Sequence, residues 1–102
     1  MTHVTLIHPF EVKTNQEEAF LKAWHSVDDY MTKQKGFIET KLYRSLNNPN
    51  ADSISFTNVA LWENSESFMA AINQETFKLI SKEVLTFSCG PKLYQAFYEA
   101  KA

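Results

Sequence analysis

Asn58 and Trp62 are the two side chains whose types and spacing most readily suggest chemistry. They lie four residues apart in an alternating segment, residues 54–62, so both fall on one face of a predicted strand. Strand residues rise about 3.3 Å each, which puts the two about 13 Å apart, far enough to hold opposite ends of a planar ligand. Asparagine is disfavoured in mid-strand. The alternative role for Asn58 is structural: its side chain would hydrogen-bond a backbone group at a bulge or at a sheet edge.

His8 is the next candidate, because its neighbours on the predicted helix-facing side of the first strand are all apolar. A lone histidine in such a place is more often a hydrogen-bonded core residue than a catalyst. The same alternatives, core or pocket wall, apply to Phe20 and Trp24 in the first predicted helix and to Phe68 in the second. We expect His8, Trp62 and Phe68 to border a cavity.

Motifs for metals, cofactors and covalent catalysis are missing from the sequence. The two glycines, Gly36 and Gly90, are too few for a phosphate-binding or dinucleotide-binding loop. His3 and His8 lie five residues apart and would point to opposite faces of one strand, so they cannot share a metal there. The single Cys89 excludes an internal disulfide and has no histidine nearby in sequence. We therefore expect neither a metal nor a cofactor.

The composition describes one folded domain, residues 1–102. Aromatic residues make up 14% of the chain, more than so small a core needs, so some are expected in a pocket or subunit interface. Lys and Arg number 10 against 12 Asp and Glu, with no basic cluster, so we expect no nucleic-acid partner. No apolar run is long enough to cross a membrane, and we expect a cytoplasmic protein. The adjacent Asp28 and Asp29 are expected on a solvated helix face.

Six predicted elements follow one another as strand, helix, strand, strand, helix, strand. Strands are predicted at residues 4–12, 37–45, 54–62 and 93–100, and helices from Thr14 to Gly36 and from Asn64 or Ser65 to about Val84, with an interruption at 74–76. A turn is predicted at residues 47–52. This order is that of the α+β, ferredoxin-like split βαβ fold, a four-stranded antiparallel sheet with two helices on one face.

The second face of this sheet would be too apolar to leave in water. The residues expected there are Thr5, Ile7, Val59 and Leu61, together with Ile38, Thr40 and Leu42. We therefore predict a homodimer packed through that face, with Tyr94, Phe97 and Tyr98 of the last strand available for the contact.

Two stretches of the sequence resemble the antibiotic biosynthesis monooxygenase superfamily. They are Gly36-Phe37-Ile38, at the entry to the second strand, and residues 55–68, SFTNVALWENSESF, in which a strand ends in Trp-Glu before a helix. The resemblance implies a dimer of ferredoxin-like subunits. In the cofactor-independent, quinone-forming branch of the family, an Asn-x-x-x-Trp pair on the third strand serves catalysis, and Asn58 and Trp62 match it.

That branch implies a monooxygenase that oxidises a small aromatic or quinol-type substrate with O2, the substrate itself being the reductant. Asn58 and Trp62 are then the catalytic residues. The residues expected to bind the substrate are His8, Phe20, Trp24, Phe68 and Lys82, of which Phe68 replaces the branch's tyrosine and Lys82 its arginine.

Two other functions remain open. The protein would have the same fold if it were a non-catalytic dimer that binds a small molecule or takes part in a stress response. The haem-degrading branch of the family shares Trp62, but His8 stands in place of its asparagine and Ser81 near the position of its axial histidine. Because the axial imidazole is missing, haem degradation ranks third.

Overall fold

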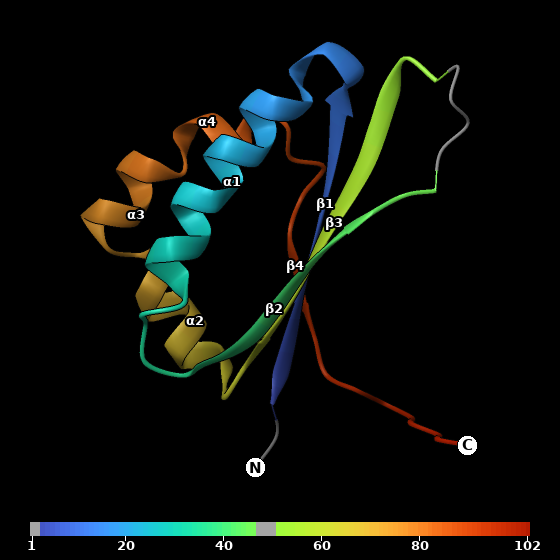
Figure 1. The fold of residues 1–102 in the computed structure, drawn as a ribbon. Coiled ribbons are helices and arrows are strands. Elements are labelled where there is room, and N and C mark those ends of the chain that lie inside the picture. The colour runs from blue at the N-terminus through green and yellow to red at the C-terminus, as the bar shows by residue number, and fades with distance from the viewer. Residues whose placement is uncertain (1–2, 47–50) are drawn as a thin grey trace.

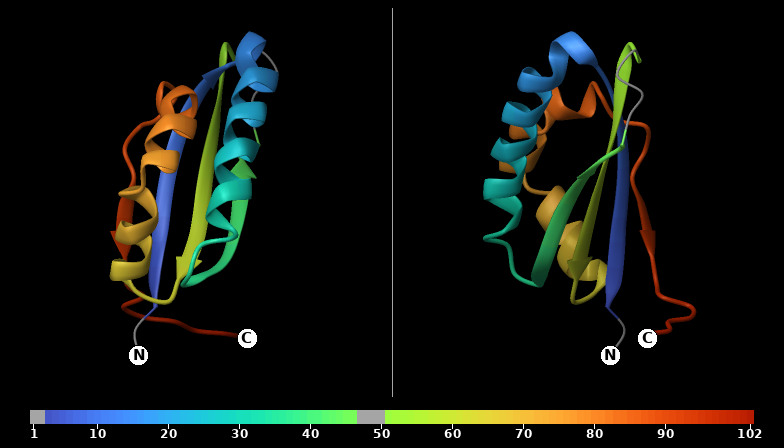
Figure 2. Two further views of the ribbon diagram at one scale, coloured as in Figure 1. Left: turned by 90° about the vertical axis from the view of Figure 1, so that its left-hand side faces the viewer. Right: turned by 45° about the vertical axis from the view of Figure 1, so that its right-hand side comes forward.

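A four-stranded antiparallel sheet carries all the helices on one of its faces in the computed structural model, which describes residues 3–46 and 51–102 (Figures 1 and 2). The strands are β1 (Val4–Lys13), β2 (Phe37–Arg44), β3 (Ser53–Trp62) and β4 (Lys92–Tyr94). The helical segments are η1 (Thr14–Gln16), α1 (Glu17–Met31), α2 (Ser65–Ile72), α3 (Glu75–Ile80) and α4 (Lys82–Leu85). The strand order β2-β3-β1-β4 confirms the predicted ferredoxin-like arrangement.

The second predicted helix is divided into three short ones. The break between α2 and α3 falls at the predicted interruption, and a second break separates α3 from α4 at Ser81. The first helix begins later than predicted, after the single turn of η1. Of the predicted turn, residues 47–50 lie outside the described part of the chain.

The two central strands, β1 and β3, pair along their whole length. The alternation predicted for β1 is confirmed, since every second residue is buried against the helices: Val4, Leu6, His8, Phe10 and Val12. The antiparallel register sets Asn58 opposite His8 and Trp62 opposite Val4. Because directly opposite residues point to the same face of a sheet, the two polar side chains meet in its centre, under the helices.

Two clusters of buried apolar side chains lie on either side of this polar pair. One is formed by Phe10, Val12, Phe20, Ala23, Trp24, Ile54, Phe56 and Val84. The other is formed by Val4, Leu6, Met31, Ala60, Trp62, Phe68 and Ala71. Along both strands, His8 and Asn58 come between the residues of one cluster and those of the other. The half-buried Val27 of α1 packs against both clusters and bridges them from above.

Some side chains of β2 point to the other face of the sheet than the sequence predicted. A bulge between Phe37 and Glu39 inserts one residue, so Phe37 pairs with Trp62 while Thr40 pairs with Ala60. Thr40 and Leu42 therefore point toward the helices and not toward the open face, where they were expected. The bulge turns both Phe37 and Thr40 toward the interior, which simple alternation would not allow.

The last strand is much shorter than the predicted 93–100. Tyr94 of β4 pairs with Thr5, and β1 begins one residue earlier, at Val4. The pairing of β4 with β1 ends at this residue pair. Residues 95–102 leave the sheet, as Figures 1 and 2 show, and Phe97 and Tyr98 are 102% and 83% exposed.

Gly36 closes the connection from α1 to β2 with a positive φ of 89°. That conformation favours glycine, and a Cβ added there would collide with the side chain of Ser67. The sequence predicted that the first helix runs to Gly36, but α1 ends at Met31 with Thr32 as its cap, so Gly36 belongs to the turn that follows the helix. Within residues 3–46 and 51–102, the helices all fall short of the length and apolar character that a membrane span requires.

Candidate active site

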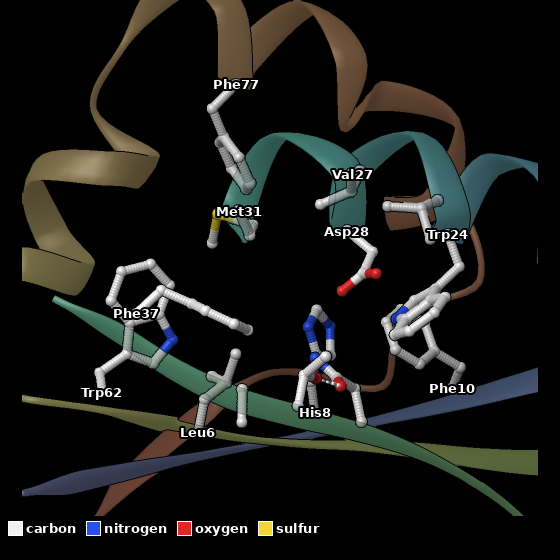
Figure 3. Close-up of a pocket in the computed structure, with 14 residues that line it drawn as sticks. Leu6, His8, Phe10, Trp24, Val27, Asp28, Met31, Phe37, Trp62 and Phe77 are labelled. Carbon is white, nitrogen blue, oxygen red and sulfur yellow. Dashed lines mark hydrogen bonds between the residues drawn. The ribbon is translucent and has the colours of Figure 1, made fainter. Parts of the chain in front are cut away.

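A pocket opens between the sheet and the helices, above the His8–Asn58 pair (Figure 3). The space between its side chains amounts to about 520 Å³, a volume that includes space open to solvent. The sheet contributes Leu6, His8, Phe10, Phe37, Thr40, Asn58, Ala60 and Trp62. The helices contribute Trp24, Val27, Asp28, Met31, Phe77 and Val84. Most of the lining is apolar or aromatic, with few polar groups set into it.

Asn58 is held by its neighbour on β2. The hydroxyl of Thr40 donates a hydrogen bond to Asn58 Oδ1 at 2.5 Å. Because the amide oxygen is occupied in this way, the Nδ2 amino group is the part of Asn58 left to donate to a ligand. The asparagine is therefore not used to satisfy a backbone group, which was the alternative explanation for its position in the strand.

Trp62 is fully buried and packs edge-on against two phenylalanines. Its ring centroid lies 5.5 Å from that of Phe37 and 5.6 Å from that of Phe68, both in T-shaped contacts. The indole Nε1 has no hydrogen-bond partner within the described chain, and Figure 3 shows this nitrogen on the side of the indole that faces the pocket. A buried N–H without a partner costs about 1–3 kcal/mol. An acceptor atom on a bound ligand would remove this cost.

His8 is fixed on the pocket floor as a neutral ring. Its Nε2 lies 2.6 Å from the hydroxyl oxygen of Ser88, and its ring stacks on Phe10 with centroids 4.2 Å apart. Burial lowers the pKa of His8 from 6.5 to about 4, because the charged imidazolium is poorly solvated there. His8 is therefore uncharged at neutral pH.

Asp28 enters the pocket from α1, on the wall opposite His8, and Figure 3 shows its carboxylate pointing toward the histidine ring. Partial burial raises the pKa of Asp28 above its ordinary value. The neighbouring Asp29 raises it further, and His25 acts in the opposite direction. The pocket thus contains a carboxylate with increased proton affinity beside a neutral imidazole.

Four of the residues predicted for the site line this pocket together: His8, Trp24, Asn58 and Trp62. The other three do not. Phe20 is fully buried within one apolar cluster, and Phe68 is buried behind Trp62. Lys82 is exposed at the start of α4. Phe68 was expected to border the cavity, but it is absent from the lining and packs edge-on against Trp62, which does line it.

Several pocket residues were not predicted. Asp28 was expected on a solvated helix face, but it follows Trp24 by four residues and precedes Met31 by three, and all three line the pocket. This helical spacing is the signal that could have found it. The bulge in β2 concealed the inward orientation of Thr40 and Phe37, and Phe77 enters the pocket from α3.

Solved structures share this fold over nearly the whole chain. SnoaB from Streptomyces nogalater, described as a cofactor-independent oxygenase, has a TM-score of 0.78 at 20% identity, over 97% of each chain. A candidate monooxygenase from Shewanella loihica PV-4 has a TM-score of 0.74 at 28% identity, over 96% of this chain and 97% of its own. A conserved protein from Methanosarcina mazei Go1 has a TM-score of 0.75 at 21% identity, over 92% of each chain.

Comparison of the sequence with curated proteins and with family models gives two different results. No curated protein matches the chain significantly. The family model for antibiotic biosynthesis monooxygenase matches residues 3–83, from the start of β1 into α4. This match spans three of the four strands and every residue that lines the pocket except Val84. The chain therefore belongs to the antibiotic biosynthesis monooxygenase family.

Proposed function

We propose that this protein is a cofactor-independent monooxygenase that oxidises a small planar aromatic substrate with O2. Two donors in an aromatic pocket carry the proposal: Trp62 Nε1, which has no hydrogen-bond partner within the described residues, and Asn58 Nδ2, since Thr40 engages the oxygen of that amide. Donors fixed in a site that excludes water are suited to stabilise an oxyanion as it forms. The family, and the fold shared with a cofactor-independent oxygenase, agree with this chemistry.

The reaction draws all its electrons from the substrate. A ring carbon bearing two hydrogens loses one as a proton, and the electron pair is delocalised onto a ring oxygen. One electron passes to O2, and the substrate radical and superoxide combine to form a carbon–oxygen bond. The peroxide takes up a proton, the second hydrogen leaves as a proton, and the O–O bond breaks. The products are a ring carbonyl, which completes the quinone, and water.

The pocket residues have separate tasks in this sequence. Asn58 donates a hydrogen bond to the ring oxygen that carries the negative charge, Trp62 donates one to an acceptor at the other end of the ring, and Thr40 keeps the amide of Asn58 in the donating orientation. The side chains of Trp24 and Phe37 provide aromatic walls for a planar ring. Their apolar surface also limits the water that would otherwise protonate the carbanion.

We also propose that the protein acts as a homodimer joined through the open face of the sheet. Ile7, Val59 and Leu61 on this face are only partly buried, and no helix of the described chain covers them (Figure 2). Tyr94, Phe97 and Tyr98 add large exposed side chains at the end of the chain. Sedimentation at micromolar concentration would give a dimer mass if this is right and a monomer mass if it is wrong.

Oxygen uptake tests the proposed activity. The protein, treated with a chelator and mixed anaerobically with 9-anthrone and with naphthols and dihydroxyanthracenes, whose keto forms have a ring carbon bearing two hydrogens, is transferred to air-saturated buffer in an oxygen electrode. O2 consumption above the buffer rate with at least one compound, together with the quinone product, is the expected result. Quenching of tryptophan fluorescence by a compound that is never oxidised would instead identify a non-catalytic binding protein.

A further inference from the structure

Only two of the 14 residues lining the pocket carry an imidazole or a carboxylate, and they lie on opposite walls. His8 comes from β1 on the floor and Asp28 from α1 above it (Figure 3). The other elements packed around them, α3 and α4, contribute the apolar Phe77 and Val84. A substrate that must lose a proton in this pocket therefore has two candidate acceptors.

His8 is the weaker of the two. Its Nε2 is engaged with the hydroxyl of Ser88, and the Ser88 oxygen also accepts a hydrogen bond from the backbone N–H of Gly90 at 3.0 Å. Burial lowers the pKa of His8 to about 4, so a proton placed on this ring is held poorly. The ring is suited to neutral contact with a substrate and not to removing its proton.

The carboxylate of Asp28 points into the pocket, toward the His8 ring (Figure 3). Burial and the adjacent Asp29 raise the pKa of its carboxyl group, while His25 opposes them from the same helix. A planar ligand seated between Asp28 and the sheet would displace water from the carboxylate and raise its proton affinity further. Asp28 also lies on the helix side of the pocket, whereas Asn58 donates from the sheet side. A proton can thus leave toward one wall while negative charge collects at the other.

We propose that Asp28 is the general base that takes the proton the substrate loses before it reacts with O2, an inference that rests on the proposed function. In this step a substrate C–H bond breaks and its proton forms a bond to a carboxylate oxygen of Asp28. The electron pair of that bond moves through the ring to the substrate oxygen held by Asn58. No oxidant takes part in this step, so it can be measured in the absence of O2.

Hydrogen–deuterium exchange under anaerobic conditions isolates the step. The probe is 9-anthrone, a planar ring ketone whose methylene hydrogens exchange with D2O through its anion and can be followed by NMR. The native protein is expected to accelerate this exchange above the rate in buffer. Asp28→Asn, nearly identical in shape, should lower the acceleration by about 10²- to 10⁴-fold.

Asp29→Asn is the matched control, because it removes a carboxylate one residue away that is exposed to solvent. It should retain the acceleration and move the acid limb of its pH profile to lower pH, because Asp29 raises the pKa of Asp28. Asp28→Glu, which keeps a carboxylate, should restore part of the rate. Circular dichroism and thermal unfolding establish that each variant is folded.

The outcomes separate this inference from the proposed function. Exchange in Asp28→Asn as fast as in the native protein would overturn the role of Asp28. The same conclusion would follow if the native protein consumed O2 with 9-anthrone without accelerating exchange, and the proposed function would then still stand. Accelerated exchange that depends on Asp28, without O2 uptake, would support the base and contradict the oxygenase.

Discussion

The pKa of His8 predicts a specific loss of stability in mild acid. The imidazole has a pKa of about 4 in the folded protein, against 6.5 in an unfolded chain, because burial opposes its charge. The unfolded chain therefore binds a proton as the pH falls below 6.5, while the folded protein binds it only near pH 4. Stability contributed by neutral His8 is fully present above pH 6.5 and is lost as the pH falls toward 4.

The size of this loss follows from the two pKa values. The gap between 6.5 and about 4 corresponds to about 3.4 kcal/mol of unfolding free energy once the pH is below both. At pH 5 the unfolded chain is almost fully protonated at this position and the folded protein is not. About 2 kcal/mol is therefore lost between pH 7.5 and pH 5.

Urea unfolding of the native protein and of His8→Gln at pH 7.5 and pH 5 measures this loss. Glutamine keeps a hydrogen-bonding group near Ser88 but loses the ring stacking on Phe10, so the variant is expected to be less stable at pH 7.5. Because glutamine takes up no proton, the variant lacks the His8 contribution to the pH dependence. The native protein should lose about 2 kcal/mol more than the variant between the two pH values. Because other groups titrate in both proteins, only this difference counts. Equal losses would show that His8 is not held neutral by burial.

Three further substitutions test the geometry of the site and its support. Gly36→Ala should destabilise the protein more than Gly90→Ala in thermal unfolding, by about 1–3 kcal/mol, because both glycines have positive φ but only Gly36 would collide with Ser67. Equal losses would remove the collision as a cause. Thr40→Val should lower kcat about tenfold with little change in KM, since it frees the Asn58 amide to rotate, whereas Thr40→Ser should retain native turnover. If Thr40→Val turned over normally, the hydrogen bond would have no part in catalysis. Trp62→Phe should weaken binding of a dihydroxyanthracene about tenfold in fluorescence or calorimetric titration, because the Nε1 donor is lost. Unchanged affinity would show that this donor does not reach the ligand.

The central part of the fold could be predicted because its sequence pattern is regular. Strict alternation in β1 and β3 places one set of residues under the helices, and pairing of these strands brings His8 and Asn58 together. The pocket floor therefore follows from periodicity and strand order. The choice of Asn58 and Trp62 came equally from their position and from the family resemblance.

The features that the sequence did not predict are a one-residue bulge, the early end of the last strand and the inward orientation of one charged side chain. The bulge after Phe37 turns Thr40 toward the helices, and nothing in the local sequence pattern marks the position of the bulge. The last strand ends at Tyr94, and nothing in the sequence of residues 95–100 marks this end. Asp28 was overlooked because a charged residue ordinarily faces solvent, although its spacing from Trp24 places it over the pocket.

Replacement of Asn58 by alanine decides whether substrate oxidation takes place in this pocket. O2 uptake and binding are measured with the compound that the native protein oxidises fastest, using an oxygen electrode and tryptophan fluorescence. Asn58→Ala should lower kcat by about 10²- to 10³-fold while the substrate still binds, since the amide stabilises charge that develops only during the reaction. Turnover in Asn58→Ala at the native rate would contradict this account of the site.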